Sequence, residues 1–166
     1  MPTLKRLTLE GVHRAMQKAE RYRLLGEPLE AESICVDVLE VDPGNHQARI
    51  LLILSLTDRF ATDLSRVQEA TRMAAELEED YERFYYRGIV AERFGKAQLN
   101  RGGPGSDDYA NRALREAMTW YERAEAVRPL GDDDAILRWN TCARAILRRG
   151  FAEPPDLPKP AVVMTE

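Results

Sequence analysis

Histidine and cysteine, which often carry metal or nucleophilic chemistry, are few in this sequence and form no pattern. His13 and His46 have no Cys, Glu or His at the spacing that a metal site needs. Cys35 and Cys142 lie far apart, each inside an expected helix and flanked by apolar residues. Buried free thiols are therefore the expected state, with redox or metal chemistry as the alternative. We expect no metal site.

The glycine-rich stretch from Arg101 to Ser106 is easily mistaken for a phosphate-binding loop. It lacks the lysine and the preceding strand that such a loop requires. A flexible turn between two helices fits better, because Ser106, Asp107 and Asp108 are typical of a helix start.

Acidic residues are plentiful, but none forms a recognisable catalytic pair. A run such as Glu76 to Asp80 at a helix end is typical of a solvated surface. No nucleophile lies in a glycine-bounded turn of the kind that catalysis uses. We therefore expect no enzyme activity, no catalytic residue and no cofactor.

Composition and charge narrow the class of protein further. The chain has 166 residues, 44% apolar and 31% charged, with a net charge of −4. No basic face is concentrated enough to bind a nucleic-acid backbone. The apolar run from Ile50 to Leu56 is far shorter than the roughly 20 residues that span a bilayer. With no secretory signal at the N-terminus, we expect a cytoplasmic protein that binds neither nucleic acid nor membrane.

The stretch from Tyr22 to Asn45 contains a complete turn, helix and stop. Gly26 and Pro28 are typical of a turn and a first helical position. Apolar residues then recur at helical spacing, and Pro43 disfavours helical geometry just before itself. A second apolar stripe precedes Tyr22, so the unit is predicted to be two antiparallel helices. Such a pair cannot bury its own faces and must stack on neighbours.

This unit resembles a tetratricopeptide repeat. Ala19 and Tyr22 match the small residue and the tyrosine of the family's first helix, and Gly26 matches its turn glycine. Ala31 and Pro43 match the small residue of the second helix and the proline that closes the repeat. The resemblance implies a right-handed superhelix of antiparallel helix pairs. The resemblance indicates no chemical activity, because the matched residues serve in the packing of helices.

The rest of the chain continues the pattern. Asn45 is predicted to cap a third helix whose residues from Ala48 to Leu56 are apolar on almost every side, as in an element covered by several neighbours. Asp63 or Ser65 opens a fourth helix, with Ser65 and Gln68 at capping-box spacing.

A third unit begins near Tyr81 and departs from the family. Phe84, Gly88 and Gly95 match family positions, but residues 96–108 intervene before the pattern resumes. We interpret this as a lengthened helix pair with the glycine-rich stretch at its tip. A last helix is expected from about Asp134 to Arg149, with Gly150 as its left-handed cap.

The predicted fold is therefore all-α, with about seven helices: three pairs, the third elongated, and a closing helix. Residues 1–150 form the helical repeat domain, and residues 151–166, which are rich in proline, form an extended tail.

The resemblance also implies a binding site, because the family holds peptides or helices on the concave wall made by the first helix of each pair. The alternative is that these side chains are simply core. Carried onto this sequence, the predicted contact residues are Leu51, Leu54, Tyr85, Tyr86, Ile89, Arg93, Trp139 and Asn140.

Asn140 stands where family members often hold a ligand backbone with both ends of an amide, although a local hydrogen bond on the helix is the alternative. The clamp that chaperone-binding members use for a C-terminal carboxylate is missing. Its positions are occupied by Met16, Glu20, Leu51, Glu82 and Tyr86, and none of these is Lys, Arg or Asn.

The predicted function is a non-catalytic adaptor for a protein or peptide partner. The alternative is a self-assembling structural protein, a homodimer formed through the long third hairpin or through the tail. The tail could also be a polyproline ligand for another protein or lie back across its own groove, with disorder as the alternative.

Overall fold

The structure is a computed structural model that describes residues 1–155. Within that range it contains seven α-helices, two short 3-10 helices and no β-strand, which confirms the predicted all-α class. The helices are α1 (Val12–Leu24), α2 (Pro28–Val41), α3 (His46–Asp58), α4 (Val67–Ala75), α5 (Asp80–Arg101), α6 (Ser106–Ala126) and α7 (Asp134–Arg149); the 3-10 helices are η1 (Leu9–Gly11) and η2 (Leu64–Arg66).

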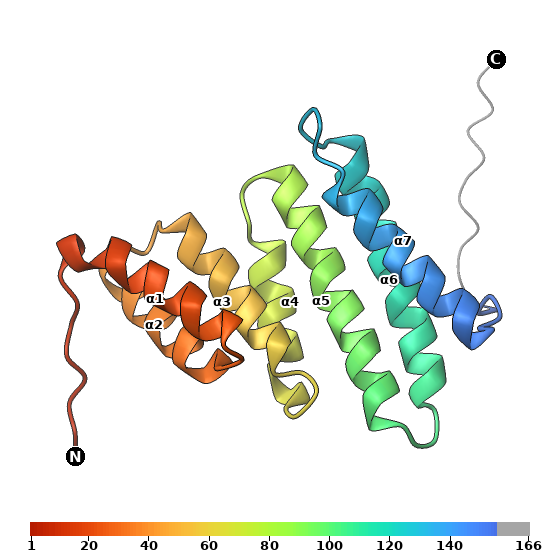
Figure 1. Ribbon diagram of the computed structural model, residues 1–166, viewed down its shortest axis with the longest axis horizontal. Helices are drawn as coiled ribbons and strands as arrows, with labels where there is room; N and C mark the ends of the chain where they lie inside the picture. The colour runs from red at the N-terminus through yellow and green to blue at the C-terminus, as the bar shows by residue number, and fades with distance from the viewer. Residues whose placement is uncertain (156–166) are drawn as a thin grey trace.

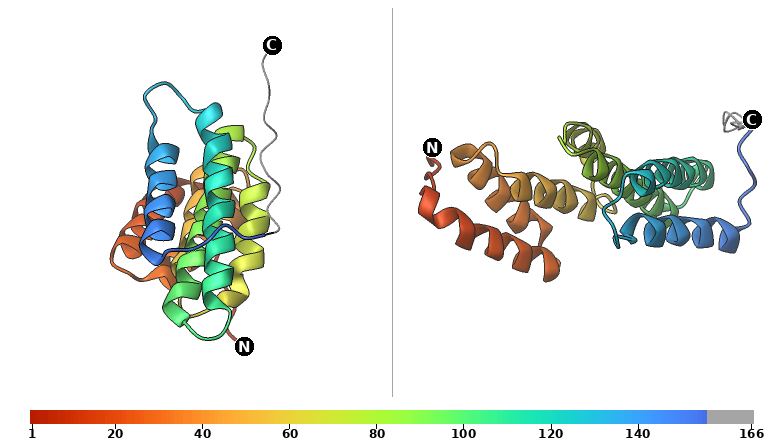
Figure 2. Two further views of the ribbon diagram at one scale, coloured as in Figure 1. Left: turned by 90° about the vertical axis from the view of Figure 1, so that its right-hand side faces the viewer. Right: turned by 90° about the horizontal axis from the view of Figure 1, so that it is seen from above.

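Helices adjacent in the sequence lie side by side and form a row from α1 to α7 (Figure 1). Contacts also join alternate helices, α1 with α3 and α3 with α5. The view from above in Figure 2 places α1 and α7 on the same side of the row. This is the side that faces the reader in Figure 1, where α7 lies in front of α6.

The third helix is the most enclosed. The Asn45 side chain accepts a hydrogen bond from the Ala48 N–H at 2.9 Å, which confirms the predicted cap. Residues on every side of α3 are buried, from Leu51, Leu52 and Ile53 to Leu56. The pattern of apolar residues around this helix follows from its contacts with α2, α4, α5 and α1.

The third pair is elongated as predicted. Its helices α5 and α6 contain 22 and 21 residues, and the glycine-rich stretch forms the turn between them. Gly102, Gly103 and Gly105 all have positive φ there, which side chains of other residues rarely tolerate.

Two groups of buried side chains form the core, and α5 contributes to both. Val90 and Ala97 pack with residues of α1 to α4, whereas Ile89 and Ala91 pack with residues of α6 and α7. The fifth helix is therefore the wall that joins the two halves of the row.

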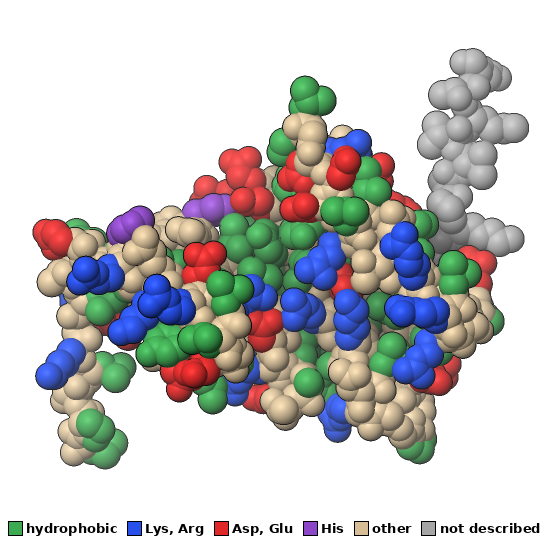
Figure 3. Space-filling model, viewed as in Figure 1, with side chains coloured by type: hydrophobic (Ala, Val, Ile, Leu, Met, Phe, Trp, Pro, Cys, Tyr) green, Lys and Arg blue, Asp and Glu red, His purple; other side chains and the backbone are tan. Residues whose placement is uncertain are grey.

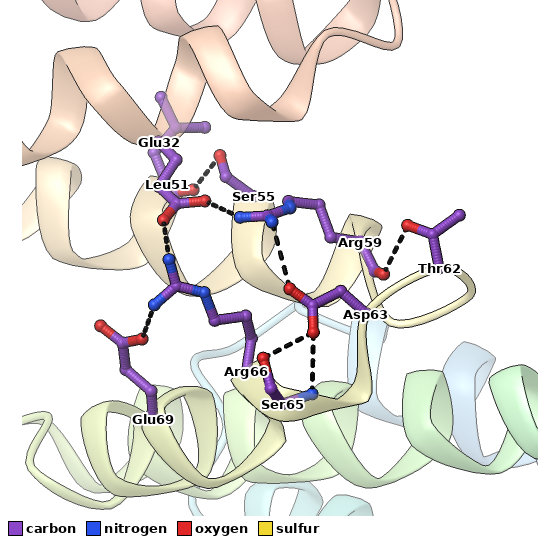
Figure 4. A network of polar contacts seen from close by, with 9 residues as sticks. All are labelled: Glu32, Leu51, Ser55, Arg59, Thr62, Asp63, Ser65, Arg66 and Glu69. Carbon is purple, nitrogen blue, oxygen red and sulfur yellow. Dashed lines mark hydrogen bonds and ion pairs between the residues drawn. The ribbon is translucent and has the colours of Figure 1, made fainter.

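An ion-pair network joins α2 to the segment that leads into α4 (Figure 4). Glu32 accepts hydrogen bonds from Arg59 at 2.5 Å and from Arg66 at 3.1 Å. Asp63 accepts from the Ser65 N–H at 3.0 Å and from the Ser65 hydroxyl. These bonds from Ser65 are the main reason why the pKa of Asp63 is lowered. Asp63 is thus the cap of η2. The Ser65 capping-box prediction was wrong, because Ser65 lies inside η2 and α4 begins only at Val67, after Arg66.

The chain after α7 turns back onto α6. Gly150 has a φ of +65° at the end of α7, as predicted. Phe151 then packs on the core of the second half, and the Asn111 side chain donates a hydrogen bond to the Ala152 carbonyl at 2.8 Å. The start of the predicted tail is thus fastened to α6. Most of that tail, residues 156–166, lies outside the described residues.

Gly88 lets α5 approach α6, because a Cβ atom added there would lie 2.7 Å from Cδ1 of the buried Tyr121 ring. We expect Gly88→Ala to lower the free energy of unfolding by about 1 to 3 kcal/mol, the usual cost of overpacking. Urea unfolding followed by circular dichroism measures this.

Gly44→Ala is the matched control, since an added Cβ there meets nothing within 4 Å. Equal stability of the two variants would show that close contact at Gly88 is not required.

Candidate functional site: the alternate-helix groove

Two neighbouring hollows lie between alternate helices, and together we call them the alternate-helix groove. The first, about 180 Å³, lies between α1 and α3 and is lined by Ile50, Leu51 and Leu54 among others. The second, about 290 Å³, lies between the end of α3, α5 and α7 and is lined by Arg93, Lys96 and Arg138 among others. Apolar side chains thus line one hollow, and basic side chains line the next.

A three-residue ion bridge stands where the hollows meet. Arg23 of the first hollow holds Asp58 of the second, with 2.7 Å between Arg23 Nε and Asp58 Oδ2. From the opposite side Arg93 donates to Asp58 Oδ1 at 2.9 Å. One carboxylate therefore links α1, α3 and α5, and this bridge stands between the two hollows.

A second carboxylate, Glu92, lies behind the basic hollow and is fully buried. It accepts hydrogen bonds from the Tyr121 hydroxyl at 2.6 Å and from Arg138 at 3.2 Å, and it pairs with Lys96. Burial, and then the charge of Glu92, raise the pKa of Tyr121, so its hydroxyl keeps the proton that it donates. This network ties α5, α6 and α7 together.

Of the contact residues predicted from the sequence, three line the groove: Leu51, Leu54 and Arg93. Leu51 is only 8% exposed, so Leu54 is the more accessible of the two leucines. Ile89 is 1% exposed and belongs to the core.

Tyr85 and Tyr86 lie half-buried on α5 and line neither hollow. The Tyr85 ring stacks on Tyr81 at 5.8 Å between centroids and meets the Tyr86 ring edge-on at 5.2 Å. Burial raises the pKa of Tyr86 to about 12. Both rings contribute to packing between helices, and the structure leaves their predicted contact with a partner untested.

Trp139 and Asn140 also lie away from both hollows. The Trp139 indole N–H donates to Glu122 of α6 at 3.0 Å, and the ring packs on the core of the second half. Arg138 instead is the α7 residue that faces α5. Contact of Trp139 and Asn140 with a partner stays a prediction.

Sequence reasoning missed the charged members of the groove: Arg23, Asp58, Lys96 and Arg138. One signal was available, since Arg23, Asp58 and Arg93 are separated by 35 residues at each step. Opposite charges at the interval of one helix pair indicate contacts between successive first helices.

The thiols are protected from chemistry. Cys35 and Cys142 are both free and buried. Burial chiefly, with a nearby glutamate in each case, raises the pKa of both thiols to about 12. They are therefore protonated and weakly nucleophilic at neutral pH.

The described part of the chain offers little else for chemistry. No group of three His, Cys, Asp or Glu side chains within residues 1–155 is arranged to hold a metal ion. Among the helices of this same range, none combines the length and hydropathy needed to cross a membrane.

Comparison with known proteins gives no further guide. No protein-family model, no curated protein and no solved structure matches this chain. The surface chemistry of the groove therefore carries the functional argument.

The Tyr121 hydroxyl can be tested by Tyr121→Phe, which keeps the ring but leaves buried Glu92 with one donor fewer. We expect the free energy of unfolding to fall by roughly 1.5 to 3 kcal/mol, as for a hydrogen bond to a charged group. Tyr109→Phe, at a residue that is 60% exposed, is the control and should change little. Equal unfolding midpoints for the two variants would contradict the network.

Proposed function

We propose that this protein is a non-catalytic adaptor that holds a peptide or helix of a protein partner in the alternate-helix groove. The observation that carries the proposal is the pairing of an apolar hollow with an adjoining basic hollow. Apolar anchors with polar groups beside them are common in surfaces that recognise other proteins. We further propose a cytoplasmic protein.

A tetratricopeptide-like right-handed superhelix is part of the proposal. Its support is the burial of small residues at the family's packing positions, Ala19, Ala31 and Gly88. The groove is lined by α1, α3 and α5, which are the first members of the three pairs, and by the closing helix α7. In that family these helices form the concave binding wall.

The space-filling view supports the same surface (Figure 3). Apolar side chains are exposed near the middle of the face, and Lys and Arg side chains gather over α5 and α7. This arrangement would suit a partner that brings both apolar and polar side chains.

Ile50→Gln with Leu54→Gln tests the groove. We expect the double variant to keep its helical circular dichroism but to lose at least tenfold in partner capture, because two apolar anchors each contribute more than about 1 kcal/mol. Capture from lysate, with quantitative mass spectrometry, measures this.

Val36→Gln is the matched control, since Val36 is 51% exposed on α2 and lines neither hollow. If the double variant and this control capture the same proteins in the same amounts, the groove is not the binding site.

Self-association is the second candidate function, and one observation favours it. Leu137 and Leu147 on the last helix are 61% and 78% exposed. We expect light scattering behind a sizing column to find a dimer that becomes a monomer in Leu137→Gln/Leu147→Gln. Loss of the dimer only when residues 156–166 are removed would assign it to the tail, and a monomer at every concentration would refute self-association.

A further inference from the structure

The charges around the basic hollow do not cancel. Arg23, Arg93, Lys96 and Arg138 surround two carboxylates, Asp58 and Glu92, so this cluster carries an excess of two positive charges. The whole chain has a net charge of −4. The surface at the basic hollow is therefore positively charged, although the protein as a whole is negatively charged.

The positive groups are also the accessible ones. The side chains of Arg93, Lys96 and Arg138 are 28%, 40% and 33% exposed, whereas Glu92 is 0% and Asp58 is 21% exposed. An approaching partner therefore has more access to these three cations than to either carboxylate. Each cation also has more N–H donors than its internal partners use.

The apolar hollow does not select for charge. Its lining includes one acidic residue, Glu20, and one basic residue, Arg23, beside the side chains of Met16, Ile50 and Leu54. Charge selection is therefore confined to the α5–α7 side of the groove.

We propose that the segment held in the groove is an acidic peptide whose apolar side chains enter the hollow at Leu54 and whose Asp or Glu side chains meet Arg93, Lys96 and Arg138. This inference rests on the proposed function and adds the chemistry of the partner. Complementary charge increases the rate of encounter and excludes partners of the wrong sign.

The apolar hollow favours a peptide over a nucleic acid or a free phosphate. Only the peptide brings apolar side chains to Ile50 and Leu54 next to the cations. The basic groups also occupy other positions than the family's C-terminal carboxylate clamp, whose positions hold no Lys, Arg or Asn. The proposed contacts therefore need acidic side chains within the partner's chain and do not need its C-terminal carboxylate.

The test is selection of random 12-residue peptides, displayed on phage, against the immobilised full chain. Enriched peptides are then synthesised with fluorescein and measured by fluorescence anisotropy. We expect enrichment of Asp and Glu together with Leu, Ile or Phe. Replacing the acidic residues by Gln or Asn should weaken binding, and so should added salt, because salt screens exposed charges.

Two single variants locate the effect. Lys96→Gln removes one cation of the groove and leaves Glu92 bonded to Arg138 and Tyr121. We expect it to weaken binding by about two- to fivefold, which corresponds to one partly exposed charge contact. Lys18→Gln is the control, because it changes the net charge by the same amount. Lys18 is exposed on α1 and lines neither hollow, so this variant should leave the affinity unchanged.

The outcomes separate the two proposals. Enriched neutral or basic peptides that lose binding in Leu54→Gln would overturn the acidic preference and keep the groove as the binding site. Equal effects of Lys96→Gln and Lys18→Gln would likewise overturn it. If no enriched peptide depends on Leu54 or Lys96, both proposals fail.

Discussion

Close approach of neighbouring helices is the constraint on which the rest of this structure depends. No pair can bury its apolar faces alone, so each helix is stabilised by the next. The contacts are made through residues with little side chain, such as Ala19, Ala70 and Ala124, which are fully buried. Gly88 is the extreme case, because the Tyr121 ring occupies the space that a Cβ would take. The hydroxyl of that ring then reaches Glu92, so the closest contact also positions the charged network.

Carboxylates at three joints fix how the helices are placed relative to one another. Glu32 joins α2 to the segment before α4, Asp58 joins α1, α3 and α5, and Glu92 joins α5, α6 and α7. Such pairs contribute little net stability, because removal of charge from water offsets the attraction. Their effect is geometric, since each accepts hydrogen bonds from two directions. The basic groups that face the groove are therefore held in place from behind.

Local features of the fold could be predicted from the sequence, and relations between distant residues could not. The Asn45 cap, the enclosed α3 and the glycine turn at the long hairpin are each determined within a few residues. The rotation of α7 about its axis is not local. It places Arg138 toward α5 and Trp139 toward Glu122, and it depends on which side chain reaches buried Glu92. The packing of the half-buried tyrosines of α5 follows from the same long-range contacts.

In the adaptor that we propose, the charged network makes stability and recognition depend on the same residues. A free arginine loses side-chain entropy when a partner orders it, which weakens binding. Arg93 and Arg138 are already ordered by Asp58 and Glu92, so that loss occurs on folding. A groove without these carboxylates would carry more positive charge but would hold it in flexible side chains. Asp58 and Glu92 therefore reduce the attraction of the groove for an acidic partner, but they hold its hydrogen-bond donors in a fixed arrangement. Under the proposed function, such an arrangement would distinguish partners by where their charges lie as well as by how many they carry.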